Sequence, residues 1–189
     1  MSNYIETYLN ETETIAKTIN RDSIAKAVEV LREIKNSKGR LFVHGVGGSA
    51  GNASHAVNDF RKIAGMECYA PTDNVSELTA WTNDASWEEV FERMLKGSQL
   101  RAGDGLLILS VGGGSKTASL NLVRAMDYGK SVGAKIVSIV SRDGGHAHNV
   151  SDACVLVPVM HPDRITPHAE GWQGVVWHLI VNAMIQPNA

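Results

Sequence analysis

The sequence has little cysteine and no long apolar run. Its 189 residues include only two cysteines, Cys68 and Cys154, which lie far apart, so neither a disulfide framework nor a cysteine metal site is indicated. No window approaches the length and hydrophobicity of a membrane span, and the N-terminal segment carries acidic residues where a signal peptide needs a positive start and an apolar block. We therefore expect a cytoplasmic protein with no membrane partner.

Charge blocks and low-complexity tracts are also missing. Charged residues make up 20% of the chain and the formal net charge is −2, which gives no electrostatic reason to expect nucleic acid or an anionic membrane as the main partner. A local basic pocket for a small anion stays compatible with this balance. The hydrophobic content of 43% and the length suit one globular domain, so we predict a single domain over 1–189.

What the sequence does contain is an alternation of helical and strand periodicity. Buried strands are predicted at 40–44, 105–109, 134–140 and 152–157, with a short one at 67–70. Helices are predicted at 3–37 with a break near 20–22, at 49–63, twice within 74–97 around a break at 82–86, at 115–129 and at 167–184. Strands covered on both faces and separated by helices pair in parallel through right-handed crossovers. The pattern predicts an α/β fold, a three-layer αβα sandwich around a doubly wound parallel sheet.

The two leading helices, within residues 1–38, precede the first strand and have nothing of their own to bury against. They must pack on the sheet layer or on another subunit. We predict that they pack on both, and that the protein is a homo-oligomer.

Two glycine-rich loops follow predicted strands, GVGGS at 45–49 and SVGGGS at 110–115. In an open parallel sheet the ligand crevice lies beyond the carboxyl ends of the strands, where both loops lie. Glycine lets the backbone approach an anion, and the N–H groups of a helix's first turn donate to it. Neither loop matches the dinucleotide or P-loop pattern. A single such loop can be a mere tight turn, but two on one rim, each ending in a serine at a predicted helix start, favour binding of phosphate, or of phosphate and sugar hydroxyls.

Two pairs of ionisable residues lie on predicted helices. His55 and Asp59 are four residues apart and share a face, so they could bind one ion or act together, although spacing alone favours a simple surface pair. Glu170 and His178 lie within about 80° of each other around the terminal helix, and Gln173 is the alternative partner for His178. Spacing does not show whether the two pairs meet.

Other polar residues carry weaker signals. Asn83 and Asp84 lie in a turn-prone stretch, so Asp84 is as well explained by a helix cap as by a ligand. His146 and His148 lie in a polar turn after the third long strand, where solvated histidines are the more ordinary interpretation.

The order of these motifs resembles the sugar isomerase (SIS) domain family and, within it, the phosphoheptose isomerases. The shared motifs are the Gly-x-Gly-Gly-Ser loop, the Asn-Asp element, the serine-containing second loop, SRDGG after the third long strand, and a histidine on the C-terminal helix, and they span essentially the whole chain. The resemblance implies a flavodoxin-like fold and isomerisation of sedoheptulose 7-phosphate to D-glycero-D-manno-heptose 7-phosphate. It also implies a bound Zn²⁺ and a homotetramer with active sites between subunits, whose assembly would bring the two helices together.

The resemblance assigns roles residue by residue. It implies that Asp59 is the catalytic base and His178 the acid of an enediol mechanism. The implied zinc ligands are His55, Asp59, Glu170 and His178. The implied substrate-binding residues are Gly47, Gly48, Ser49, Asp84, Ser110, Gly112, Gly113 and Ser115. Zn²⁺ would polarise the sugar oxygens, and one residue cannot be a tight metal ligand and a free base at the same instant.

Three departures from the family pattern keep alternatives open. Asp59 is one methylene shorter than the usual glutamate, and a shift of about 1 Å in a catalytic group can cost on the order of a hundredfold in rate. Glu170 replaces a glutamine, which adds negative charge for a divalent metal. The second loop lacks two hydroxyls of the family's phosphate loop; backbone N–H groups, Lys116, Arg61 or Lys62 could replace them. A non-catalytic phosphosugar-binding or protein-interaction module, or an isomerase of another sugar phosphate, is the alternative.

Overall fold

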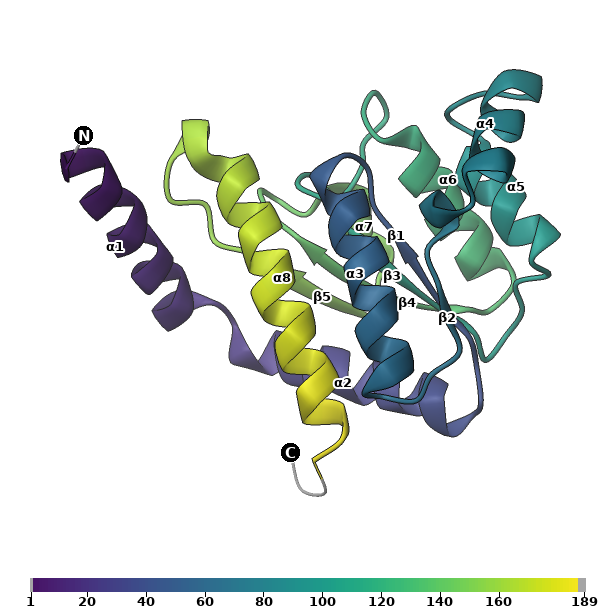
Figure 1. The fold of residues 1–189 in the computed structure, drawn as a ribbon, viewed down its shortest axis with the longest axis horizontal. Coiled ribbons are helices and arrows are strands. Elements are labelled where there is room, and N and C mark those ends of the chain that lie inside the picture. Colours follow the sequence, from purple (N-terminus) through teal and green to yellow (C-terminus); the bar gives the residue numbers. More distant parts are fainter. Residues whose placement is uncertain (1, 187–189) are drawn as a thin grey trace.

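A parallel sheet of five strands forms the centre of the molecule in the computed structural model, which describes residues 2–186 (Figure 1). The strands are β1 (Leu41–His44), β2 (Cys68–Tyr69), β3 (Gly105–Leu109), β4 (Lys135–Val140) and β5 (Ala153–Leu156). Their order is β2-β1-β3-β4-β5, and every neighbouring pair is parallel. This confirms the predicted doubly wound α/β sandwich.

Helices cover both faces of the sheet (Figure 1). One layer consists of α2 (Arg21–Asn36), α3 (Gly48–Lys62) and α8 (Ile165–Met184), and the other of α4 (Val75–Asp84), α5 (Val90–Gly97), α6 (Leu120–Ser131) and α7 (Gly145–Val150). Short 3₁₀ turns lie at Pro71–Asp73 and Pro162–Arg164. No helix among residues 2–186 is long and apolar enough to cross a membrane.

Alternation along the strands divides the core in two. Leu41 and Val43 of β1 point into the cluster under α2, α3 and α8, whereas Phe42 points into the cluster under α5 and α6. All five residues of β3 are buried, because a central parallel strand is covered on both faces. Helices therefore pack on both faces of the sheet, and only loops lie at the carboxyl ends of its strands.

Two predicted helix boundaries were wrong. The helix expected at 115–129 begins only at Leu120, because Gly113, Gly114 and Ser119 adopt positive φ angles of 70°, 83° and 53°. The Ser115 hydroxyl also accepts backbone N–H groups of the following turn, which competes with helix formation. The helix before the 82–86 break continues to Asp84, so Asp84 ends α4 and caps no following helix.

The prediction of a polar turn at His146 and His148 was also wrong. These residues form the short helix α7 (Gly145–Val150), whose first N–H groups donate to carbonyls of the second glycine loop.

A buried ion cluster attaches α1 (Ser2–Thr18) to the start of α8. Arg164 donates to both carboxylate oxygens of Glu11, at 2.6 and 2.8 Å, and His168 Nε2 lies 2.8 Å from Glu11 Oε2. The Tyr8 ring stacks on His168 with centroids 4.4 Å apart. Beyond this attachment α1 extends past the sheet (Figure 1) and exposes Tyr4, Ile5 and Leu9.

This cluster predicts an acid-sensitive attachment of α1. The hydrogen bond from Arg164, with a further one from His168, lowers the pKa of Glu11 from 4.5 to about 2. Because the folded chain holds this proton less tightly than the unfolded chain, the stabilisation is present above about pH 4.5 and is lost as the pH falls toward 2. The free energy of unfolding of wild type minus that of Glu11→Gln should therefore be largest near neutral pH and shrink in acid.

Glu13 supplies the matched control, since its pair with Lys17 is more than half exposed on both sides. Glu13→Gln should change the free energy of unfolding little at any pH, because exposed ion pairs contribute little. A Glu11→Gln effect that is the same at every pH would contradict the prediction.

Candidate active site

A cleft opens at the carboxyl edge of the sheet, between β1 and β3. Chain order makes this the crevice of the fold, because α3 leaves β1 toward one face and α6 leaves β3 toward the other. The cleft has a volume of about 410 Å³, a size suited to a small ligand. It is lined by Val46, Ser49, Ser110, Val111, Gly112, Gly114, Ser115, Ala118, Ser119, Arg142, Asp143, Gly145 and Thr166. Both glycine loops thus lie on one rim, as the sequence predicted.

The first loop leads into α3 through two positions, 47 and 48, where only glycine fits without strain. Gly47 precedes the helix at φ 65°, and a Cβ on Gly48 would collide with the Glu170 carboxylate. Ser49 is buried and its Oγ donates to Glu170 Oε1 at 3.2 Å. Gly47 and Gly48 therefore shape the loop without lining the cleft.

The second loop is fixed by contact with the turn after β4. A Cβ on Gly113 would overlap the carbonyl of Gly144. The N–H groups of His146 and Ala147 donate to the carbonyls of Gly114 and Gly113, at 2.8 and 2.9 Å. Gly113 thus supports the loop from behind, and the first N–H groups of α7 are engaged within the protein.

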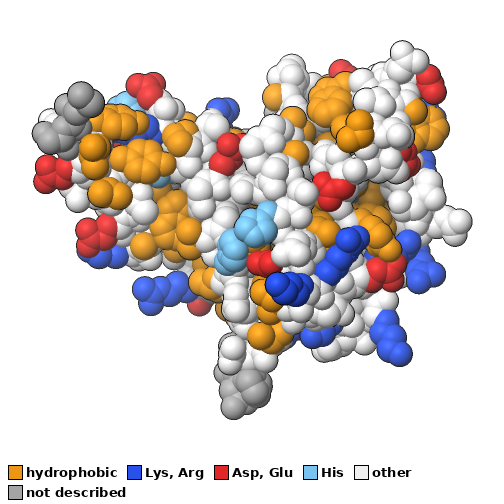
Figure 2. Space-filling view, in the orientation of Figure 1, with side chains coloured by type: hydrophobic (Ala, Val, Ile, Leu, Met, Phe, Trp, Pro, Cys, Tyr) orange, Lys and Arg blue, Asp and Glu red, His pale blue; other side chains and the backbone are white. Residues whose placement is uncertain are grey.

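A cluster of potential metal ligands lies on the outer surface of α3 and α8. His55, Asp59 and His178 each offer one ligand atom, and these atoms lie within 4.8 Å of one another. His178 Nε2 is 3.6 Å from Asp59 Oδ2. Figure 2 shows histidine and acidic atoms next to each other over these helices.

The expectation that subunit assembly brings the two helices together was wrong. Neighbouring helices α3 and α8 pack against each other within one chain (Figure 1). Asn52 of α3 donates to the backbone oxygen of Glu170 and to Gln173 Oε1, both at 2.9 Å. His178 therefore meets His55 and Asp59 without a partner subunit.

The donor set of this cluster fits zinc. Two imidazole nitrogens and one carboxylate oxygen form one of the ligand sets of catalytic zinc, which leaves a further position open. His178 Nδ1 donates to the Gly174 carbonyl at 2.7 Å, which leaves Nε2 with its lone pair toward Asp59 and fixes the ring. Asn58 donates to Asp59 Oδ1, so Oδ2 is the oxygen that faces the histidines.

Two predicted site residues lie elsewhere in the structure. Glu170 is outside the cluster, since its carboxylate accepts from Ser49; its role as a fourth ligand stays a prediction that this arrangement does not support. The alternative partner of His178, Gln173, is buried against Asn52. Asp84 does not line the cleft in this chain; it ends α4 and accepts from Asn83 at 2.8 Å.

Sequence reasoning missed four polar residues that line the cleft: Ser119, Arg142, Asp143 and Thr166. Arg142 belongs to the SRDGG motif, which was recognised but given no role. None of His55, Asp59 or His178 lines the cleft, so one chain carries the cleft and the metal-ligand cluster as separate features.

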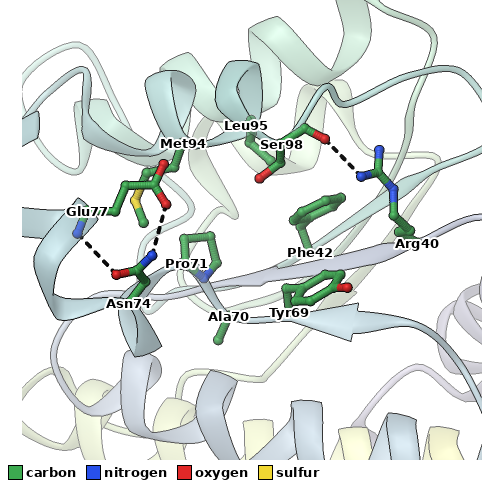
Figure 3. A pocket seen from close by; sticks show the side chains of 10 residues that line it. All are labelled: Arg40, Phe42, Tyr69, Ala70, Pro71, Asn74, Glu77, Met94, Leu95 and Ser98. Carbon is green, nitrogen blue, oxygen red and sulfur yellow. Dashed lines mark hydrogen bonds between the residues drawn. The ribbon is translucent and has the colours of Figure 1, made fainter.

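A second hollow of about 310 Å³ lies between the β2 edge of the sheet and helices α4 and α5 (Figure 3). Its polar groups are engaged with one another: Asn74 donates to Glu77, and Arg40 donates to Ser98 and to Asp104. The phenyl ring of Phe42 and the ring of Tyr69 face the hollow. It offers no set of free polar groups like that of the cleft, so the cleft is the better candidate for a ligand site.

Comparison with known proteins decides the family. The model of the SIS domain family matches residues 3–141. The chain belongs to the SIS domain family. Phosphoheptose isomerases of Helicobacter pylori strain Shi470 (29% identical over 165 residues, 84% of this chain and 83% of the relative) and Chlorobium phaeobacteroides (32% over 154 residues, 76% and 66%) are among its relatives. They confirm the resemblance to phosphoheptose isomerases.

The fold of this SIS domain is shared with solved structures. The phosphoheptose isomerase of Neisseria gonorrhoeae superposes with a TM-score of 0.82 at 23% identity and covers 97% of this chain and 95% of its own. The family match ends before α8, whereas the superposition reaches nearly the whole chain. The helix that carries His178 is therefore part of the shared fold.

Proposed function

We propose that this SIS domain is an aldose–ketose isomerase that converts sedoheptulose 7-phosphate to D-glycero-D-manno-heptose 7-phosphate. The meeting of His55, Asp59 and His178 carries the proposal, because isomerisation needs a base and an acid held side by side. The kinship with phosphoheptose isomerases supports a heptose phosphate as the substrate. The substrate-binding roles of Ser49, Ser110, Gly112 and Ser115 are supported by their place in the cleft lining.

In this mechanism Asp59 and His178 move protons. Asp59 Oδ2 takes the proton from the carbon beside the carbonyl and returns it to the neighbouring carbon. His178 Nε2 takes the proton of the adjacent hydroxyl and passes it to the carbonyl oxygen, so the net charge is unchanged. The 3.6 Å between these two atoms lets both reach the same pair of carbons.

We propose Zn²⁺ as the resident metal, with His55, Asp59 and His178 as the ligands that this chain supplies. When bound, zinc polarises the oxygens of the substrate. Asp59 has one free oxygen because Asn58 engages the other. His178 likewise offers only Nε2, because Nδ1 donates to the Gly174 carbonyl. Each of the two residues would therefore act either as a metal ligand or as a proton carrier at a given step.

We further propose a homo-oligomer, a tetramer, in which the cleft of one subunit faces the cluster of another. The separation of cleft and cluster within one chain supports this arrangement. So do the large apolar side chains left exposed on α1 and on α8: Tyr4, Ile5, Leu9, Val175 and Leu179. The cytoplasmic location expected from the sequence stays a prediction.

The test is to incubate zinc-loaded protein with sedoheptulose 7-phosphate and to follow aldose formation by NMR, beside a sample stripped with EDTA. We expect product only in the metal-containing sample, and recovery when zinc is restored. Affinity for the sugar phosphate without product, in a sample shown to contain zinc, would instead establish a binding module. Product at the same rate after stripping would refute the role of the metal.

A further inference from the structure

The cleft holds one positively charged side chain, Arg142. Among its lining residues only Arg142 and Asp143 carry charge, and the Asp143 carboxylate accepts the N–H of Gly145. None of the cations suggested by the sequence lines the cleft: Lys116, Arg61 and Lys62. Arg61 donates instead to the carbonyl of Cys68 and lies over the ring of Tyr69.

The Arg142 guanidinium is uncommitted and lies over the second glycine loop. A methyl group on Gly112 would lie 3.9 Å from Arg142 Cδ and 4.0 Å from Nη1. Among residues 2–186 the guanidinium makes no hydrogen bond or ion pair. Its donors are therefore free for a ligand in the cleft.

Arg142 occupies its position at a conformational cost. It is the second residue of a turn closed by the Gly144 N–H and the Ser141 carbonyl, 3.0 Å apart, and its φ is 56°. A left-handed backbone costs a non-glycine residue about 1–2 kcal/mol. Such strain at a ligand cleft points to a functional demand on the side chain.

Three other non-glycine residues have a positive φ, and two of them have a structural reason that Arg142 lacks. Lys38 and Gln99 follow the ends of α2 and α5, where a left-handed residue closes a helix. Arg142 closes no helix. The fourth, Ser119, lines the same cleft, and its hydroxyl does not cap α6.

We infer that Arg142 binds the phosphate group of the substrate and makes the cleft selective for phosphorylated sugars. A guanidinium presents two parallel N–H donors that match phosphate oxygens. The hydroxyl of Ser119, which makes no hydrogen bond within residues 2–186, adds a third donor and replaces one of the two that the loop lacks. The inference deepens the proposed function, because it names the residue that distinguishes a sugar phosphate from the free sugar.

The test compares Arg142→Asn with Lys38→Asn. Asparagine tolerates the left-handed region, so both variants keep the backbone and lose one exposed positive charge. The dissociation constant of inorganic phosphate, measured by calorimetry, should rise roughly tenfold to a hundredfold in Arg142→Asn and stay unchanged in Lys38→Asn. KM for sedoheptulose 7-phosphate should rise by a similar factor, while Arg142→Lys keeps part of the affinity.

Phosphate affinity within twofold of wild type in Arg142→Asn, or no detectable phosphate binding by wild type, would overturn the inference. An equal loss in Lys38→Asn would also overturn it, because the effect would then be one of net charge. If phosphate affinity depends on Arg142 but no variant turns over sedoheptulose 7-phosphate, the inference stands and the proposed isomerase activity fails. If turnover is present and KM ignores Arg142, the activity stands and the inference fails.

Discussion

Replacing His178 by glutamine is expected to lower the turnover of sedoheptulose 7-phosphate by roughly 10²–10⁴-fold, the usual contribution of a positioned acid or base. The imidazole Nε2 facing Asp59 would be replaced by an amide that does not exchange protons at neutral pH. The side chain of His178 is 47% exposed, so the free energy of unfolding should change little. Turnover and urea unfolding measured on the same sample would separate chemistry from folding.

His161→Gln is the matched control, since His161 lies in an exposed loop before α8 and lines neither the cleft nor the cluster. It should keep wild-type turnover. The zinc content of His178→Gln, measured on the same sample, distinguishes the two possible causes of a loss of turnover. Loss of turnover with zinc retained supports the acid role, and loss of both supports the ligand role. Turnover near wild type in His178→Gln would refute both roles.

Replacing Gly113 by alanine is expected to destabilise the folded chain by about 2–5 kcal/mol. The left-handed backbone at φ 70° contributes about 1–2 kcal/mol of this, and the overlap of the new methyl group with the Gly144 carbonyl contributes about 1–3 kcal/mol of overpacking. Relief of the overlap would push the second glycine loop away from the turn after β4. Phosphate affinity should then fall together with stability.

Gly112→Ala, one residue away in the same loop, isolates the cause. Gly112 does not have a positive φ, and its added methyl group would meet Arg142 only at ordinary contact distance. Its free energy of unfolding should lie within about 1 kcal/mol of wild type and should not fall, because alanine in place of a glycine whose backbone angles suit it restricts the unfolded chain. Equal destabilisation of the two variants in urea would show that backbone contact with the turn is not what fixes the loop.

The sequence was sufficient for the sheet and for the place of the cleft. Central parallel strands are apolar throughout, so 105–109 could be read from composition alone, and parallel order then places both glycine loops at one edge. The predicted helix boundaries were wrong where a side chain bonds to the backbone and so prevents the helix that the hydrophobic periodicity indicates. Ser115 engages the backbone in a turn, and α6 starts five residues later.

Contacts between helices could not be predicted, because periodicity gives a direction around one axis and says nothing about the neighbour. His55 and Asp59 share a face, and Glu170 and His178 nearly do. Only the parallel packing of α3 on α8 shows that His178 reaches Asp59, whereas Glu170 reaches Ser49. Arg142 was missed for another reason: its importance lies in a φ angle, and an arginine in a turn motif gives no sign of a left-handed backbone.

The bond between Ser49 and Glu170 joins positions 121 residues apart, and the cluster of His55, Asp59 and His178 spans a similar separation. Contacts between distant parts of a chain stabilise it only after the cost of closing the intervening loop has been met. The sheet can therefore assemble while α8 is still undocked, and such an intermediate would contain the glycine loops but no complete reactive centre. Acquisition of activity during refolding would then come later than the burial of the strands, after α8 has docked and the subunits have assembled.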